Sequence, residues 1–235
     1  MKSSHKQYDL QQSIDRIDDI LLTGDPAYEE VNSIPSRDRL TFNNGFYVWC
    51  SVLFIDIRGS SELPSKYRRP SLARIYRAYI SEMVAIINGN SNCAELNIEG
   101  DAVWGVFDTP NKNNINSVFS TAAKLASMTK ILNCRFQKKK GYSPINTGIG
   151  MDYGRALMLK AGYKGSSIND IVWMGDVVNN ASNLCSSGNK CSYDKQIMVS
   201  NCVYNNLNDY NKSLLCRNYF RDFYHGDVVN NSMEE

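Results

Sequence analysis

The sequence predicts an α+β fold, a ferredoxin-like sandwich with βαββαβ order and a C-terminal extension. Three observations predict it: an apolar run that ends on an acid, an apolar helical stripe after that run, and a hairpin followed by a second stripe. The chain has 235 residues, of which 43% are hydrophobic and 21% are charged. This composition is typical of a globular protein with enough apolar residues for one core.

The first strand of this order is predicted at residues 51–57, because a short apolar run bounded by turn signals favours a buried strand. The run ends on Asp56, and Gly59 with two serines forms the turn after it. A buried ionised carboxylate must pair with a cation or with hydrogen-bond donors. From this segment alone, Asp56 has two interpretations: it caps the next helix, or it is a functional acid.

The following segments complete the order. A helix is expected where apolar residues recur at steps of three and four, and a hairpin where two strand-like segments flank Glu99-Gly100-Asp101. A second helix comes next, and then a strand, a turn at residues 152–154 and another short strand. In chain order these elements are predicted at residues 70–87, 94–107, 116–137 and 145–160.

The C-terminal extension begins after a glycine-punctuated loop. A strand is predicted first, then a helix opened by Gly175, and then a strand, a short helix and a strand pair. These elements are expected at residues 168–174, 176–184, 197–200, 202–207 and 214–229. At the other end, residues 1–45 are interpreted as an N-terminal helical appendage and residues 46–235 as the catalytic domain. The helix predicted at 8–22 is amphipathic, and it packs either on its own domain or on a second subunit.

Charge and cysteine content exclude several classes of function. The net charge of +2 is too close to neutral to indicate a nucleic-acid partner or an acidic membrane surface. Seven scattered cysteines and two histidines, with no CxxC pair, argue against a zinc site and favour reduced thiols. No run reaches the roughly 20 apolar residues of a membrane span, and the first thirty residues do not resemble a signal peptide. We therefore expect a cytoplasmic protein that binds neither nucleic acid nor membrane.

The hairpin supports the functional interpretation of Asp56. Asp101 lies at the hairpin tip, so two strand-end carboxylates can converge at one end of the sheet. Magnesium sites are commonly built from one or two carboxylates together with substrate phosphates. Two such ions about 4 Å apart would hold the attacking and leaving oxygens of a phosphoryl transfer.

Four segments, taken together, resemble the signatures of class III nucleotidyl cyclases in the right order over about residues 46–210. They are Phe54 to Ser60, Gly100-Asp101, Gly148 to Gly150 with Gly154, and Gly175 to Ser182. The resemblance implies a homodimer with two composite sites at its interface, each taking its metals from one subunit and its base contacts from the other. The substrate would be a nucleoside triphosphate, whose 3′-hydroxyl attacks the α-phosphate and releases pyrophosphate.

The same resemblance implies roles for individual residues. Asp56 and Asp101 would be catalytic and would ligate two divalent cations, Mg²⁺ or Mn²⁺, with the backbone carbonyl of Ile57 as a further ligand. Asn179 would orient the ribose. The arginine that usually stands four residues after this asparagine is replaced by Asn183. The loss of one donor to a transition state typically costs about 3–4 kcal/mol, so another cation is expected to replace it.

The candidate replacement cations lie in two segments. Lys160 and Lys164 are the first candidates, because their glycine-flanked loop can bring them to a triphosphate. Arg155 and Arg58 are the others.

The positions that read the base depart from those of purine-using members. Asn97 stands where such enzymes carry Lys or Glu, and Val172 stands where they carry Asp, Thr, Ser or Cys. A pocket that leaves polar groups unpaired discriminates against its ligand, so adenine and guanine are both disfavoured. Large residues, among them Phe54, are either core or the walls of a small cavity that suits a pyrimidine; the others are Tyr47, Trp104 and Trp173.

Residues 158–165 and 172–175 resemble the bacterial pyrimidine cyclases of Pycsar antiphage systems. This resemblance implies formation of cyclic UMP or cyclic CMP, which acts on a separate cyclic-nucleotide-gated effector. We predict a uridylate cyclase that converts UTP to cyclic UMP. The alternatives are a cytidylate cyclase, a degenerate cyclase fold that only binds nucleotide, and a polymerase-like or diguanylate-cyclase palm.

Overall fold

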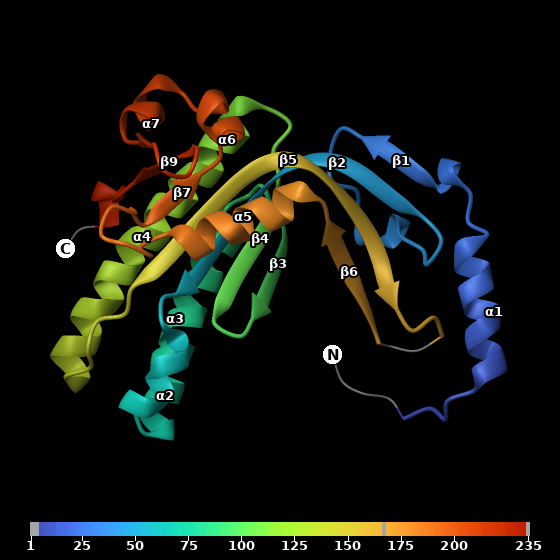
Figure 1. Cartoon of the computed structure of the whole chain (residues 1–235), viewed down its shortest axis with the longest axis horizontal. Helices are drawn as coiled ribbons and strands as arrows, with labels where there is room; N and C mark the ends of the chain where they lie inside the picture. The colour runs from blue at the N-terminus through green and yellow to red at the C-terminus, as the bar shows by residue number, and fades with distance from the viewer. Residues whose placement is uncertain (1–4, 166–167, 234–235) are drawn as a thin grey trace.

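The computed structural model describes residues 5–165 and 168–233, and its centre is a split βαβ sandwich (Figure 1). The sheet runs in the order β3-β4-β2-β5, and each of these neighbouring pairs is antiparallel. This is the strand order of the ferredoxin-like fold, so the predicted βαββαβ architecture is confirmed. Its elements are β2 (Gly45–Ile57), α3 (Arg69–Asn88), β3 (Cys93–Glu99), β4 (Ala102–Asp108), α4 (Lys112–Lys140) and β5 (Thr147–Gly162).

Strand β2 is buried on both faces, and alternate residues enter two separate cores. Leu53 and Ile55 pack in the larger core with the apolar stripes of α3 and α4. Val52 and Phe54 point the other way, into a second cluster beneath α5 (Asp176–Ser187). A continuous apolar run therefore predicts this strand better than a period-two alternation would.

Glycines bring α5 close to the sheet. A Cβ atom on Gly150 would collide with the backbone of Ala181 and Cys185, and one on Gly148 would collide with the carbonyl of Cys185. The helix axis can approach β5 this closely only where side chains are absent. The third sequence signature therefore positions the helix that carries Asn179.

The outer halves of β2 and β5 extend beyond the sandwich as a curved arm (Figure 1). Strand β1 (Tyr28–Val31) pairs with β2 in parallel, and β6 (Asn169–Met174) pairs with β5 in antiparallel orientation. The turn predicted at residues 152–154 is wrong, because β5 is continuous there. Asp152 and Gly154 face α5 instead: the Asp152 carboxylate is bound by Asn180 of that helix, and Gly154 lies against Val177.

The C-terminal extension continues the sheet past β5 in the order β7-β9-β8, which confirms the predicted extension. Strand β7 pairs with β5 in parallel, and β9 is antiparallel to both β7 and β8. Its elements are β7 (Ile197–Val199), α6 (Asn201–Asn206), α7 (Asp209–Ser213), β8 (Cys216–Asn218), β9 (Phe223–Gly226) and the 3₁₀ turn Asn231–Met233.

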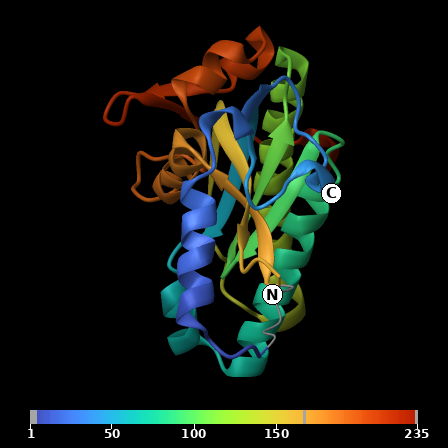
Figure 2. The same cartoon turned by 90° about the vertical axis from the view of Figure 1, so that its right-hand side faces the viewer.

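Helix α1 (Leu10–Leu21) stands beside the arm, as both views show (Figures 1 and 2). Asp19 lies 3.8 Å from the Lys164 ammonium, and the Arg16 guanidinium lies 4.7 Å from the centre of the Tyr163 ring. The apolar stripe predicted for this helix is exposed to solvent. Between α1 and β2 lie two short 3₁₀ turns, Asp25–Ala27 and Arg37–Arg39; another, Ser60–Glu62, precedes α2 (Leu63–Lys66). Among the described residues, no helix is long and apolar enough to cross a membrane.

Candidate active site

Two acids meet at one end of the central sheet. Ile55 of β2 lies opposite Val103 of β4, so Asp56, one residue later, and Asp101, two residues earlier, are neighbours. Gly100 adopts a φ of +65° in the turn that carries Asp101, a conformation that favours glycine. The side chains of Asp56 and Asp101 are within hydrogen-bonding reach of each other. The structure thus brings together the two acids that the sequence singles out.

The electrostatics of this pair favour a bound cation. Burial, hydrogen bonding to Asp101 and the negative charge of Asp101 raise the pKa of Asp56 to about 6, against the opposing effects of Arg58 and the Ile57 N–H. Oδ2 of Asp101 is buried and has no hydrogen-bond partner among the described residues. Two acids that repel each other, one with an open oxygen, fit a divalent cation, which prefers carboxylate ligands.

The chain itself offers few further metal ligands here. Within residues 5–165 and 168–233, no cluster of three or more His, Cys, Asp or Glu side chains could hold a metal. The remaining ligands would therefore come from backbone carbonyls, such as that of the buried Ile57, and from substrate. This is the ligand set expected for Mg²⁺ in a phosphoryl-transfer site.

Arg58 links the acid pair to α5. Its Nη2 lies 3.1 Å from Oδ2 of Asp56, and its Nη1 donates to the carbonyl of Ser186 at 3.0 Å. Nε of Arg58 is buried without a partner in the described part of the chain. Of the four cations proposed to replace the missing arginine, Arg58 is the one that contacts a candidate metal ligand.

The base-side residues line a separate cavity of about 410 Å³, here called the base cavity. Asn97 of β3 lies opposite Trp104 of β4, which lies opposite Phe54 of β2, so all three share one face of the sheet. The rings of Phe54 and Trp104 are stacked with centroids 4.9 Å apart. The cavity is lined by Phe54, Asn97, Glu99, Trp104, Asp170, Ile171, Val172, Trp173, Val178, Asn179 and Ser182.

The base cavity and the acid pair are distinct within one chain. Phe54, Asn97, Val172 and Asn179, all selected from the sequence, line the cavity together. Asp56 and Asp101 are not among the described residues that line it. The acid pair therefore lies outside the lining of the cavity but borders it, because Asp56 follows Phe54 by two residues on β2 and Glu99 pairs with Ala102, next to Asp101.

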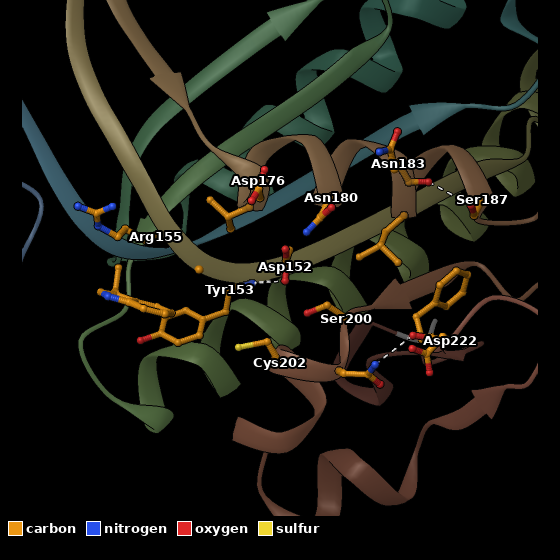
Figure 3. Close-up of a pocket in the computed structure, with 16 residues that line it drawn as sticks. Asp152, Tyr153, Arg155, Asp176, Asn180, Asn183, Ser187, Ser200, Cys202 and Asp222 are labelled. Carbon is orange, nitrogen blue, oxygen red and sulfur yellow. Dashed lines mark hydrogen bonds between the residues drawn. The ribbon is translucent and has the colours of Figure 1, made fainter.

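A second cavity, of about 600 Å³, is lined by other residues of α5 (Figure 3). Asn179 and Ser182 face the base cavity, whereas Asn180 and Asn183 face the second one, because successive helical residues are turned by about 100°. In the second cavity, Asn180 and Ser200 bind the carboxylate of Asp152, as their side chains in Figure 3 indicate. Asn183 therefore lies on the opposite side of α5 from the base cavity.

The structure does not bring the proposed lysines to the base cavity of their own chain. The Lys160 ammonium lies 5.2 Å from the centre of the Phe42 ring, and Lys164 faces Asp19 of α1. Arg155 pairs with Glu30 and lies over the Tyr47 ring. All of these partners belong to the N-terminal segment and the arm, whose contacts no local sequence pattern reveals.

Sequence reasoning missed several residues of the base cavity. Ser182 lies three residues after Asn179, and this helical spacing could have placed it on the same face. Asp170 and Ile171 precede Val172 on β6 and needed the strand pairing to be located. From the sequence, Trp104 and Trp173 are either core residues or cavity walls; in the structure each has a buried indole N–H without a partner in the described residues.

Comparisons with known proteins find similar sequences over most of the chain. Residues 45–221 match the family described as "Adenylate and Guanylate cyclase catalytic domain". A protein named "Uridylate cyclase" from Gulbenkiania mobilis is 46% identical over 216 residues, covering 89% of this chain and 83% of that protein. Another of the same name, from Treponema porcinum, is 37% identical over 227 residues, covering 95% and 78%.

Solved structures share the fold at lower identity. The adenylyl cyclase CyaB from P. aeruginosa has a TM-score of 0.63 and 22% identity, covering 75% of this chain and 87% of that one. A structure described as a "Class III adenylyl cyclase-like ATP-binding protein" from Pseudomonas aeruginosa has a TM-score of 0.71 and 15% identity, covering 95% and 48%. At these identities the likeness concerns the fold alone.

Proposed function

Because this chain belongs to the adenylate and guanylate cyclase catalytic domain family, we propose that it is a homodimeric uridylate cyclase. It converts UTP into 3′,5′-cyclic UMP and pyrophosphate. The observation that supports UTP as the substrate is the base cavity. Asn97 and Val172 stand at its base-reading positions, and stacked aromatic rings restrict its space. The two relatives named uridylate cyclases support the same choice.

The acid pair is the metal-binding half of the proposed site. Asp56, Asp101 and the carbonyl of Ile57 would hold two divalent cations, Mg²⁺ or Mn²⁺, a cofactor class that class III cyclase domains generally use. When bound, these ions supply charge neutralisation at the triphosphate and lower the pKa of the 3′-hydroxyl. Arg58 holds the carboxylate of Asp56 in place through its hydrogen bond and adds a fixed positive charge beside it.

The base cavity is the nucleoside-binding half. The aromatic wall of Phe54 and Trp104 confines the pyrimidine ring, and the Asn97 amide meets its polar edge. Asn179 hydrogen-bonds the ribose and directs the 3′-oxygen toward the α-phosphorus, which reduces the entropic barrier to ring closure. The new bond forms between the 3′-oxygen and the α-phosphorus, and the bond to the bridging oxygen of pyrophosphate breaks.

A homodimer would join the two halves. The acids of one subunit would face the base cavity of its partner, and two-fold symmetry would create two such composite sites. The resemblance to class III cyclases implies this arrangement, and among the described residues the acid pair does not itself line the base cavity. Lys160 and Lys164 lie at the arm of their own chain. They would contact the triphosphate of a bound nucleotide only if the partner subunit held that nucleotide beside the arm.

The proposed product is a signal rather than a metabolic intermediate. We place the enzyme in antiphage defence, where cyclic UMP would act on a separate cyclic-nucleotide-gated effector. The resemblance of residues 158–165 and 172–175 to pyrimidine cyclases of such systems supports this role.

The test is to incubate the purified protein with ATP, GTP, CTP and UTP in equal amounts with Mn²⁺ and to identify the products by mass spectrometry. We expect cyclic UMP and pyrophosphate to dominate. Preferential turnover of ATP or GTP would contradict the base assignment, and preferential turnover of CTP would identify a cytidylate cyclase. Tight nucleotide binding without a cyclic product would favour a binding protein, the function named for one structural neighbour.

A further inference from the structure

Two tryptophans that line the base cavity have indole donors without a partner among the described residues. Trp104 is 7% exposed and Trp173 is 6% exposed, and both line the cavity. The Nε1 atom of each is buried and makes no hydrogen bond within the described residues. A buried donor left unpaired costs about 1–3 kcal/mol, so the presence of two beside one cavity needs an explanation.

Trp104 is the better placed of the two to meet the base. It lies on the central strand of three, directly between Asn97 and Phe54, and its ring is stacked on that of Phe54. Asn97 stands at the position that the resemblance assigns to base reading, and it lines the same cavity. The indole N–H of Trp104 and the amide of Asn97 are therefore two neighbouring polar groups of the cavity on one face of the sheet.

The two groups differ in what they can distinguish. An amide offers both a donor and an acceptor, and it can turn to suit either uracil or cytosine. An indole N–H can only donate. Position 4 of uracil carries a carbonyl oxygen, which accepts, whereas position 4 of cytosine carries an amino group, which donates. An indole donor facing that position pairs with uracil and leaves two donors opposed with cytosine.

We propose that Trp104 selects uracil over cytosine by donating its indole N–H to the 4-carbonyl of the base. This inference rests on the proposed function, because it assigns a specificity residue to that same site. Asn97 then adapts to position 3 of either base and contributes little to the choice. With cytosine in the cavity the indole donor would have no acceptor at position 4, and an unpaired buried donor disfavours that base.

The test measures binding without turnover. The dissociation constants of 3′-deoxy-UTP and 3′-deoxy-CTP, which lack the attacking hydroxyl, are measured by calorimetry with the native protein, Trp104→Phe and Trp173→Phe. Phenylalanine keeps an aromatic ring on Phe54 but removes the donor. We expect Trp104→Phe to reduce the preference for the uracil analogue about tenfold or more, as loss of one discriminating hydrogen bond predicts. Trp173→Phe, which removes the matched unpaired donor from the same cavity, should leave that preference unchanged.

Three outcomes would overturn the inference: an unchanged preference in Trp104→Phe, a loss confined to Trp173→Phe, or equal binding of both analogues by the native protein. A melting curve of each variant checks that it is folded. With the native protein alone, 4-thio-UTP replaces the carbonyl with a weaker acceptor and should bind more weakly than UTP; equal binding would also contradict the role of Trp104. If the native protein prefers uracil but forms no cyclic nucleotide, the proposed function fails while this inference stands.

Discussion

Strands β2 and β5 hold two acid sites that differ in how the chain satisfies them. Asp152 of β5 is only 4% exposed, and its carboxylate accepts hydrogen bonds from the N–H of Tyr153 and from Asn180 and Ser200. Asp56 of β2 instead faces a second acid, Asp101, one of whose oxygens is buried without a partner in the described residues. The first acid is bound completely by the protein, and the second is not.

We propose that this difference separates a structural acid from a functional one. Both acids have a raised pKa, chiefly because burial, nearly complete for Asp152 and partial for Asp56, disfavours the charged form; a raised pKa alone does not distinguish them. What distinguishes them is the like charge and the open oxygen beside Asp56, which a divalent cation would satisfy. Asp152 has no such need, and its partners tie β5 to α5 and to the start of α6. The comparison predicts different responses to mutation, pH and metal.

The largest effect should follow removal of either acid of the pair. Asp56→Ala or Asp101→Ala is expected to lower the rate of cyclic UMP formation by at least about 10³-fold, because each removes a ligand whose ions contribute several kcal/mol to catalysis. The rate is measured by chromatography of the cyclic product. Substantial turnover in either variant, with the fold intact by circular dichroism, would contradict the metal assignment.

A smaller effect should separate two adjacent asparagines of α5. Asn179→Ala is expected to lower kcat/KM for UTP about 10- to 100-fold, which corresponds to the loss of one positioning hydrogen bond in a desolvated site. Asn180→Ala removes a partner of Asp152 and is the matched control. It should lower the melting temperature, and it should lower kcat less than Asn179→Ala does. Equal loss of kcat in both variants would contradict the division of α5 into two faces.

The acid pair should also destabilise the metal-free protein. Because the pKa of Asp56 is raised to about 6 in the folded state, its favourable contribution is present below pH 4 and is lost as the pH rises through 6. The side chain is 33% exposed, so solvent screening reduces the loss to about 1 kcal/mol. In a chelating buffer, the free energy of unfolding of the native protein should fall over this range, whereas that of Asp56→Asn should not.

Added Mn²⁺ provides the control for that experiment. At neutral pH it should stabilise the native protein by binding the folded state, and it should stabilise Asp56→Asn much less. Two results would contradict this description of Asp56 and Asp101. One is an equal fall in the free energy of unfolding of the native protein and of Asp56→Asn as the pH rises. The other is equal stabilisation of both proteins by Mn²⁺.

The smallest effect is expected at Asp152. Burial raises its pKa, so its contribution to stability is largest at acid pH and diminishes as the pH rises above its ordinary value. The stability of the native protein relative to Asp152→Asn should therefore be greater at acid pH than at neutral pH, as measured by urea unfolding. Mn²⁺ should leave this difference unchanged; a Mn²⁺-dependent difference would contradict the structural role of Asp152.

The same contrast shows which features the sequence could reveal. Helix α3 was expected at residues 70–87 and spans Arg69–Asn88, because a proline near its start and a regular apolar stripe are local signals. The acid pair was also predictable. Asp56 follows one strand-like run, Asp101 lies between two others, and a ferredoxin-like order places these strand ends side by side. Helix α3 was predictable from local patterns alone, and the acid pair from local patterns combined with the ferredoxin-like strand order.

Contacts between distant segments were not predictable in this way. Residues 152–154 look like a turn locally, but Asp152 is held by side chains of α5 and α6 and the strand continues. Strand β1 was not expected, because its sequence Tyr-Glu-Glu-Val is mostly polar and pairs with β2 across a long connection. Lys160 suggested a phosphate contact through its glycine-flanked loop, yet it lies against Phe42 from the N-terminal segment.

Whether the acids of one subunit serve the base cavity of another is tested by mixing two variants, one inactive and one strongly weakened. Asp56→Ala and Asn179→Ala damage opposite halves of a composite site, so a heterodimer of the two contains one undamaged site. After subunit exchange of equal amounts, the account predicts recovery of about a quarter of native cyclic UMP formation. A mixture of Asp56→Ala with Asp101→Ala, which share one half, should recover nothing. If the first mixture remains as inactive as the second, the two halves act within a single chain and the account is contradicted.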